Sequence, residues 1–357
     1  MKRVLILMML SVCLLSGQAW ASELPRELTE AAPEAAALVG DDPADSFGLT
    51  DGIRILVDGA LEDAKRYLFS GIRAVGAIMA GVVLLGAAES AAPAGKDLLG
   101  RYGTAIGALW VTAMAAGDLD SLIGLGRETV LRISQLSKAL LPTLAAAEAA
   151  SGGITAASVR QVAAVFFSDI LLTVIDRLLL PAVYLYIGAA AAGAVLEGDA
   201  MERIGELLKK AVSWVLGGLL ALFTAYLSVS GAIAGAADAQ VVKAAQSAVS
   251  AAVPVVGGIL SEAAESILAG AGLLKGMIGT AGTLALLGAC LLPFLRLGCQ
   301  YLLYQGASLV AAAAGPPKLT KLISMLGDAF ALVLAMTGAS AMLLMISLLS
   351  AMKAVLP

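Results

Sequence analysis

Three polar residues interrupt a run that is otherwise apolar. Asp169, Thr173 and Asp176 are spaced four and three residues apart, which places them on one face of a helix. An ionised side chain at the centre of a membrane helix costs roughly 2.5–3.5 kcal/mol, so such residues mark candidate functional positions. Two carboxylates and a hydroxyl at this spacing suit a polar strip that lines a pathway. The alternatives are a strip satisfied by a neighbouring helix, or an ion pair with Arg177 at the membrane edge.

The residue types argue against most enzyme chemistry. His is absent from the chain, which removes the commonest general base and metal ligand. No phosphate loop, nucleophile elbow or metal-spacing motif occurs. Intramembrane aspartyl proteases carry Gly-x-Gly-Asp, whereas the nearest string here is Leu-Glu-Gly-Asp at 196–199. Cys290 and Cys299 lie in apolar sequence and are expected to pack as small apolar residues. We therefore expect no catalytic residue, cofactor or metal.

The composition points to a membrane protein. Hydrophobic residues make up 60% of the chain, charged residues 14%, and the mean hydropathy is +0.92. A soluble domain carries roughly 45–50% apolar and about 25% charged residues. Long apolar runs rich in Ala, Leu and Gly predict an all-α fold, a polytopic transmembrane helix bundle in contact with the lipid bilayer. The Lys and Arg residues are scattered singly, so no nucleic-acid surface is expected.

The N-terminus has the pattern of a targeting signal. Lys2 and Arg3 precede an apolar stretch over Val4–Leu15, and Ala19 and Ala21 are small residues at the positions that a signal peptidase reads. We predict that residues 1–21 are a cleaved signal peptide. The alternative is an uncleaved anchor helix, although the apolar stretch is short for a span.

An acidic segment over residues 22–66 is expected to follow outside the cytoplasm. It holds eleven acidic and four basic residues, with Pro and Gly as breakers. Apolar residues recur at helical spacing between Leu49 and Tyr67, which predicts a short amphipathic helix on the membrane surface.

Residues 67–357 are expected to form a polytopic membrane domain with seven or eight spans, since a span takes about 20 apolar residues. The pair around Pro181 is either one kinked helix or a hairpin. Arg127–Ala150 and Pro254–Gly276 are predicted to be amphipathic interfacial or re-entrant helices. The basic residues leave the orientation after the second span open. The candidate spans are Tyr67–Ala88, Tyr102–Leu125, Val162–Leu179, Pro181–Leu196, Ala211–Ala237, Gly276–Leu295, Leu297–Ala314 and Ala329–Met352.

Four segments, taken in order, carry a resemblance to a known family. Residues 251–279 read AAVPVVGGILSEAAESILAGAGLLKGMIG, and this stretch closely resembles the signature region of the stage III sporulation protein AE family. Three other segments agree in order and position: ALLPTLA at 139–145 through SGG at 151–153, Leu180-Pro181, and LPF at 292–294 leading to GPP at 315–317. The candidate signature residues are Pro254, Gly257, Gly258, Glu262, Glu265 and Lys275.

The resemblance implies a membrane subunit of the secretion-like channel complex that joins the mother cell to the forespore and supports forespore development. It implies a place in the mother-cell membrane around the forespore. The implied partners are other stage III sporulation A-operon membrane proteins and their ATPase, and indirectly stage II sporulation protein Q. The family offers no catalytic residues. The alternative is a stand-alone secondary transporter of a small solute, which helices broken at Pro181 and Pro254 beside the Asp169/Asp176 face would suit.

Overall fold

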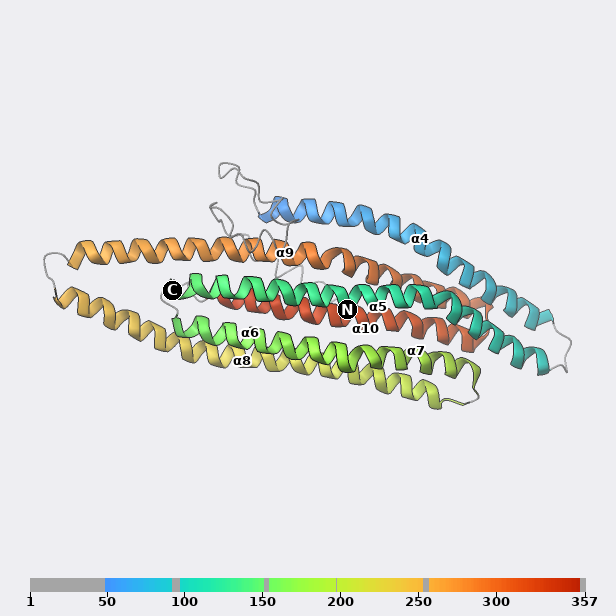
Figure 1. The fold of residues 1–357 in the computed structure, drawn as a ribbon. Coiled ribbons are helices and arrows are strands. Elements are labelled where there is room, and N and C mark those ends of the chain that lie inside the picture. Colours follow the sequence, from blue (N-terminus) through green and yellow to red (C-terminus); the bar gives the residue numbers. More distant parts are fainter. Residues whose placement is uncertain (1–48, 92–96, 151–153, 197, 253–256, 354–357) are drawn as a thin grey trace.

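The computed structural model describes residues 49–91, 97–150, 154–196, 198–252 and 257–353, and their regular structure is helical. The predicted signal peptide lies outside the described residues, as does the acidic segment before Leu49. The elements are α4 (Leu49–Ala91), α5 (Asp97–Ala150), α6 (Ile154–Val174), η1 (Ile175–Leu179, a π-helical turn), α7 (Leu180–Val195), α8 (Ala200–Ala252), α9 (Gly257–Ala314) and α10 (Pro317–Lys353) (Figure 1).

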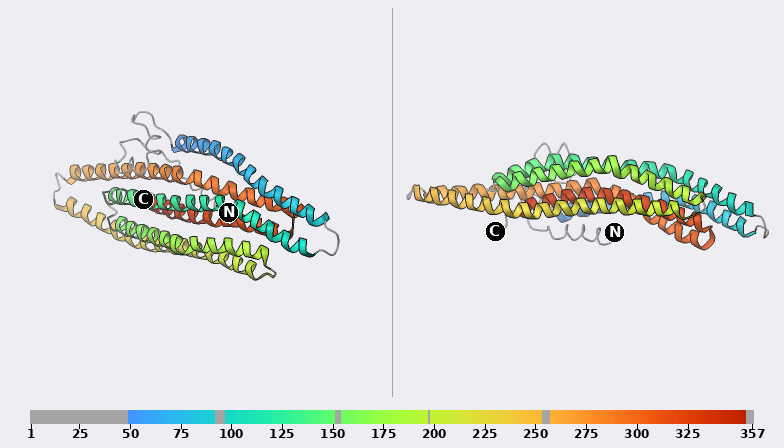
Figure 2. Two further views of the ribbon diagram at one scale, coloured as in Figure 1. Left: turned by 45° about the vertical axis from the view of Figure 1, so that its right-hand side comes forward. Right: turned by 90° about the horizontal axis from the view of Figure 1, so that it is seen from below.

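The helices form an elongated bundle of helical rods, and successive rods run in opposite directions (Figures 1 and 2). α6, η1 and α7 together make one rod. α10 lies at the centre and packs against α5, α6, α7, α8 and α9. On α10, Leu326, Phe330 and Val333 are almost fully buried at a spacing of four and three residues, which is one helix face. The central position of α10 therefore organises the core.

The outer helices present large apolar side chains on the surface. Phe69 of α4, Leu109 of α5, Trp214 and Leu222 of α8 and Leu309 of α9 are each more than 60% exposed. Large apolar side chains exposed on several helices are typical of contact with a membrane or another protein. The described residues contain six helical stretches long and apolar enough to cross a membrane: Arg54–Ser90, Tyr102–Ala150, Ala157–Val195, Ala200–Ser230, Ala281–Ala313 and Pro317–Ala351. The chain is accordingly an all-helical membrane protein.

The predicted count of seven or eight spans is not confirmed, because pairs of expected spans lie in continuous helices. Val162–Leu179 and Pro181–Leu196 are joined through η1, and the hairpin alternative at Pro181 is wrong. Gly276–Leu295 and Leu297–Ala314 both lie in α9.

The prediction that Arg127–Ala150 and Pro254–Gly276 are helices separate from the spans is also wrong. Arg127–Ala150 is the second half of α5, and the described part of Pro254–Gly276 is the beginning of α9. The predicted surface helix over Leu49–Tyr67 is the first half of α4. Amphipathic stretches thus continue the helices beyond the apolar runs. The 54 residues of α5 correspond to about 80 Å, against roughly 30 Å of hydrocarbon in a bilayer.

The turn between α7 and α8 is closed by a glycine with a left-handed backbone. Leu196 N–H donates to Ala192 O at 2.9 Å, and Gly198 follows with φ +101°. Residues with a Cβ rarely adopt this conformation, so Gly198 suits the reversal of the chain. The turn places the start of α8 beside α10, where Lys321 pairs with Glu202.

Close contact between α5 and α10 depends on a small residue at Gly126. A Cβ added there would clash with Val333 Cγ1, and a valine in a helix has little rotamer freedom to move away. Gly124, two residues earlier, has nothing within 4 Å of the corresponding position. The two glycines therefore form a matched pair for testing the helix contact.

We predict that Gly126→Ala lowers the thermal unfolding midpoint of the purified protein in detergent, since overpacking costs about 1–3 kcal/mol. Gly124→Ala should leave the midpoint unchanged or raise it, because alanine favours a helix by up to about 1 kcal/mol over glycine. Tryptophan fluorescence during heating measures both. Equal shifts for the two variants would contradict the close α5–α10 packing.

Candidate functional site

The three residues of the predicted polar face lie on the α6–η1–α7 rod, next to α5. Asp169 pairs with Lys138 at 3.1 Å, and Asp176 pairs with Arg127 at 2.6 Å. Thr173 donates its hydroxyl proton to Asp169 O at 2.7 Å, within its own helix. The two carboxylates are thus satisfied by a neighbouring helix, and both basic partners come from the stretch of α5 that sequence reasoning had treated as a separate amphipathic helix.

A third pair continues this arrangement at the end of α5. The guanidinium of Arg160 donates to the carboxylate of Glu148 across α5 and α6. We call the three cross-helix pairs the α5–α6 ladder: Arg127–Asp176, Lys138–Asp169 and Glu148–Arg160. As residue numbers rise along α5 they fall along α6, as antiparallel packing requires.

The members of the α5–α6 ladder differ in exposure. The side chains of Arg127, Asp176, Lys138 and Asp169 are 40–56% exposed, whereas that of Glu148 is 2% exposed. An ion pair in water contributes roughly 0–1 kcal/mol, but a charge turned toward hydrocarbon costs several times more. The exposed pairs are therefore suited to a face that meets water or another protein rather than lipid tails.

The buried pair borders a small cavity of about 10 Å³, which is room for at most one water molecule. Its lining includes Leu144, Glu148, Arg160, Leu227 and Ser347, so it lies where α5, α6, α8 and α10 meet. Burial makes Glu148–Arg160 sensitive to the loss of one partner, because the remaining charge would be left unpaired in a medium of low polarity.

The π-helical turn η1 places Asp176 at a proline-induced irregularity. Pro181 has no N–H, and its ring would collide with the carbonyl four residues earlier in a regular α-helix. In the structure, Leu180 N–H donates to Ile175 O, five residues earlier, which widens the turn. Widened turns of this type occur often at functional sites. Asp176 is the second residue of this turn.

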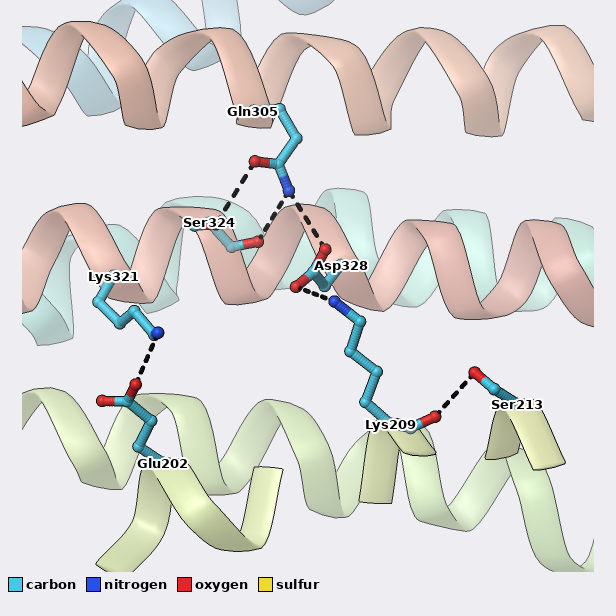
Figure 3. Close-up of polar contacts among 7 residues, drawn as sticks. All are labelled: Glu202, Lys209, Ser213, Gln305, Lys321, Ser324 and Asp328. Carbon is cyan, nitrogen blue, oxygen red and sulfur yellow. Dashed lines mark hydrogen bonds and ion pairs between the residues drawn. The ribbon is translucent and has the colours of Figure 1, made fainter. Parts of the chain in front are cut away.

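A second polar cluster, missed by sequence reasoning, joins α8, α9 and α10 (Figure 3). Lys209 Nζ donates to Asp328 Oδ2 at 2.7 Å, and Gln305 Nε2 donates to Asp328 Oδ1 at 3.2 Å. Lys321 pairs with Glu202 at 2.6 Å. The one available signal was Asp328 itself, an acidic residue directly before the apolar run Ala329–Met352.

Two further polar contacts join α9 to its neighbours, one to α5 and one to α4. Gln300 Nε2 donates to Asp118 Oδ2 at 2.8 Å, and the guanidinium of Arg296 lies 5.7 Å from the centre of the Tyr67 ring. The ring face attracts a cation at this distance. Arg296, which appeared from the sequence to end a span, is thus accommodated inside the bundle.

The signature residues add no described side-chain contact. Pro254 lies outside the described residues. The other five, Gly257, Gly258, Glu262, Glu265 and Lys275, belong to the first part of α9, where the structure describes the backbone alone. Within the described ranges, no three acidic or thiol side chains gather as metal ligands would.

We predict that reversing the charge of Asp176 lowers stability and that a second reversal restores it. Asp176→Arg places two guanidinium groups beside one another and should lower the thermal midpoint in detergent, by the equivalent of about 1 kcal/mol at an exposed pair. Arg127→Asp/Asp176→Arg should recover most of the loss. Asp58→Arg, at an exposed pair within α4, is the matched control and should change little. Failure of the double variant to recover would contradict a direct α5–η1 pair.

Comparison with known proteins covers nearly all of the described bundle. The sequence pattern of the stage III sporulation protein AE family matches residues 49–354. The curated stage III sporulation protein AE of Bacillus subtilis (strain 168) is 22% identical over 208 residues, which are 58% of this chain and 52% of the relative, so the match spans about half the length of that protein. No solved structure matches the chain. Because the family match includes all six candidate spans, this chain belongs to the stage III sporulation protein AE family.

Proposed function

We propose that this chain is a membrane subunit of the secretion-like channel complex that joins the mother cell to the forespore, located in the mother-cell membrane around the forespore. The observation that carries the proposal is the family match over residues 49–354, which gives the chain a role in sporulation and includes every candidate span. The chain is proposed to act without catalysis of its own. The energy source would be a separate ATPase, and the partners would be the other stage III sporulation A-operon membrane proteins, with stage II sporulation protein Q reached through them.

The α5–α6 ladder supports a place for this chain beside a polar pathway. It brings Arg127, Lys138, Asp169 and Asp176 to the surface of a bundle whose other exposed side chains include many large apolar groups. Charged side chains in membrane proteins generally face a water-filled space or a protein neighbour. In a multi-subunit complex, the ladder would line the polar route or the contact between subunits that encloses it.

The first test of the proposal is spore formation. Deletion of the gene should abolish heat-resistant spores, and the wild-type chain should restore them. The double variant Asp169→Asn/Asp176→Asn should restore at least tenfold fewer spores at an equal membrane level, because it removes both exposed carboxylates of the ladder.

The control for this test is Asp58→Asn/Glu62→Gln, which removes two acidic side chains from exposed pairs of α4 and should restore spores fully. Normal sporulation without the gene would overturn the role. Solute flux by the purified chain alone in vesicles, abolished by the Asp169→Asn/Asp176→Asn change, would favour the stand-alone transporter instead.

Water access to the ladder is a second test, made with single cysteines in a chain whose Cys13, Cys290 and Cys299 are replaced. Thr173→Cys, on the exposed polar face, should react with a charged thiol reagent in membranes from sporulating cells. Leu222→Cys, 63% exposed on the outer helix α8, should react at least tenfold more slowly because its apolar surroundings meet lipid. Equal rates at the two positions would contradict a polar route along the ladder.

A further inference from the structure

The six rods place three of the connections at one end of the bundle. The ends of α4, α7 and α9 and the starts of α5, α8 and α10 lie toward this end, which we call the basic end (Figure 1). Lys318 Nζ, at the start of α10, donates to Leu196 O after α7 at 2.9 Å. A Cβ on Gly315, between α9 and α10, would lie 2.6 Å from Val82 Cγ1 of α4. The α5–α6 and α8–α9 connections lie at the opposite end, the far end.

Basic residues concentrate at the basic end. The rule that Lys and Arg accumulate in cytoplasmic loops is applied within about 15 residues of the ends of spans. Within that distance of the three connections at the basic end stand seven basic residues: Lys96, Arg101, Arg203, Lys209, Lys210, Lys318 and Lys321. Within the same distance of the two connections, the start of α4 and the end of α10, all on the side of the far end, stand five: Arg54, Lys138, Arg160, Lys243 and Lys353. Two of these five, Lys138 and Arg160, belong to the α5–α6 ladder.

We infer that the basic end faces the cytoplasm, so that α4 begins and α10 ends outside it. With eight spans, the connections that carry these basic residues would lie on both sides of the membrane. With six rods, all three lie on one side. The predicted signal peptide over residues 1–21 supports the same orientation independently, since its cleavage would leave the start of α4 outside. Two unrelated features, the N-terminal pattern and the distribution of basic residues, thus agree.

The orientation places the longest overhang of the bundle outside the cytoplasm. A Cβ on Gly282 of α9 would lie 3.2 Å from Leu140 of α5 and 3.5 Å from Leu348 of α10. Beyond these contacts α5 continues to Ala150, α10 to Lys353, and α9 back to Gly257. α9 therefore extends roughly 20 Å past α5, and α8 accompanies it (Figure 2). Resting on the proposed function, this hairpin would enter the space between the two membranes.

Single-cysteine labelling of the full chain tests the orientation in intact cells. In a chain without Cys13, Cys290 and Cys299, Ala94→Cys, Asp199→Cys and Ala313→Cys mark the basic end, while Ser151→Cys and Val355→Cys mark the far end. A membrane-impermeant maleimide should label the two far-end positions in intact cells. It should label the three basic-end positions only after permeabilisation, with a change of at least tenfold, and the cysteine-free chain is the control.

Two results would overturn the inference. Labelling of the basic-end positions in intact cells, with protection of Ser151→Cys, would reverse the orientation. Disagreement among Ala94→Cys, Asp199→Cys and Ala313→Cys would show that the three connections do not share one side. Labelling measures only the side of the membrane on which each position lies, and it needs no sporulation. The orientation can therefore be wrong while the spore test supports the proposed function, and the proposed function can be wrong while the orientation holds.

Discussion

The architecture depends on the burial of α10 among four of the other five rods. Its apolar stretch has the highest mean hydropathy of the candidate spans, 2.2, and 78% of that stretch is buried, against 22% for the corresponding stretches of α4 and α8. Lipid tails are as apolar as leucine, so helices in a membrane associate through close packing rather than through the hydrophobic effect. Small residues on α10 provide this closeness: Gly327 admits Tyr304, and Gly338 admits Phe294. The outer helices then keep their own apolar residues for lipid or partner contact.

Polar contacts fix the position of each helix along the axis of its neighbours, which apolar packing alone determines less strictly. Lys209 and Asp328 are 119 residues apart in the chain, and Arg127 and Asp176 are 49 apart, yet each pair is within 2.7 Å. A slide of one helical turn, about 5.4 Å, would separate these partners. The cost of separation is largest for the buried Glu148–Arg160 pair, whose charges would be left unpaired in a medium of low polarity. The polar residues therefore specify which side chains are in contact between helices whose other surfaces are mainly apolar.

The sequence was sufficient to predict the membrane class, the helical fold and the shared face of Asp169, Thr173 and Asp176. Their spacing is a local property, and a helix preserves it. The number of rods was not predictable in the same way, because Pro181 and Arg296 resemble interruptions in a run. Both positions lie inside continuous helical rods, Pro181 after a widened turn and Arg296 within α9, where its guanidinium lies near the ring of Tyr67. The partners of the carboxylates lie on another helix, and no local pattern identifies them.

The widened turn η1 also sets the rotational phase of the rod that contains it. A π turn inserts one residue, and each residue advances a helix by about 100°. Asp176 at the start of the turn points to α5, while Val183 and Tyr186 beyond it are buried in the core. Without the inserted residue, the face of α7 that packs on the bundle would be rotated by more than a quarter turn. The widened turn thus shifts the buried face of α7 around the rod relative to the buried face of α6.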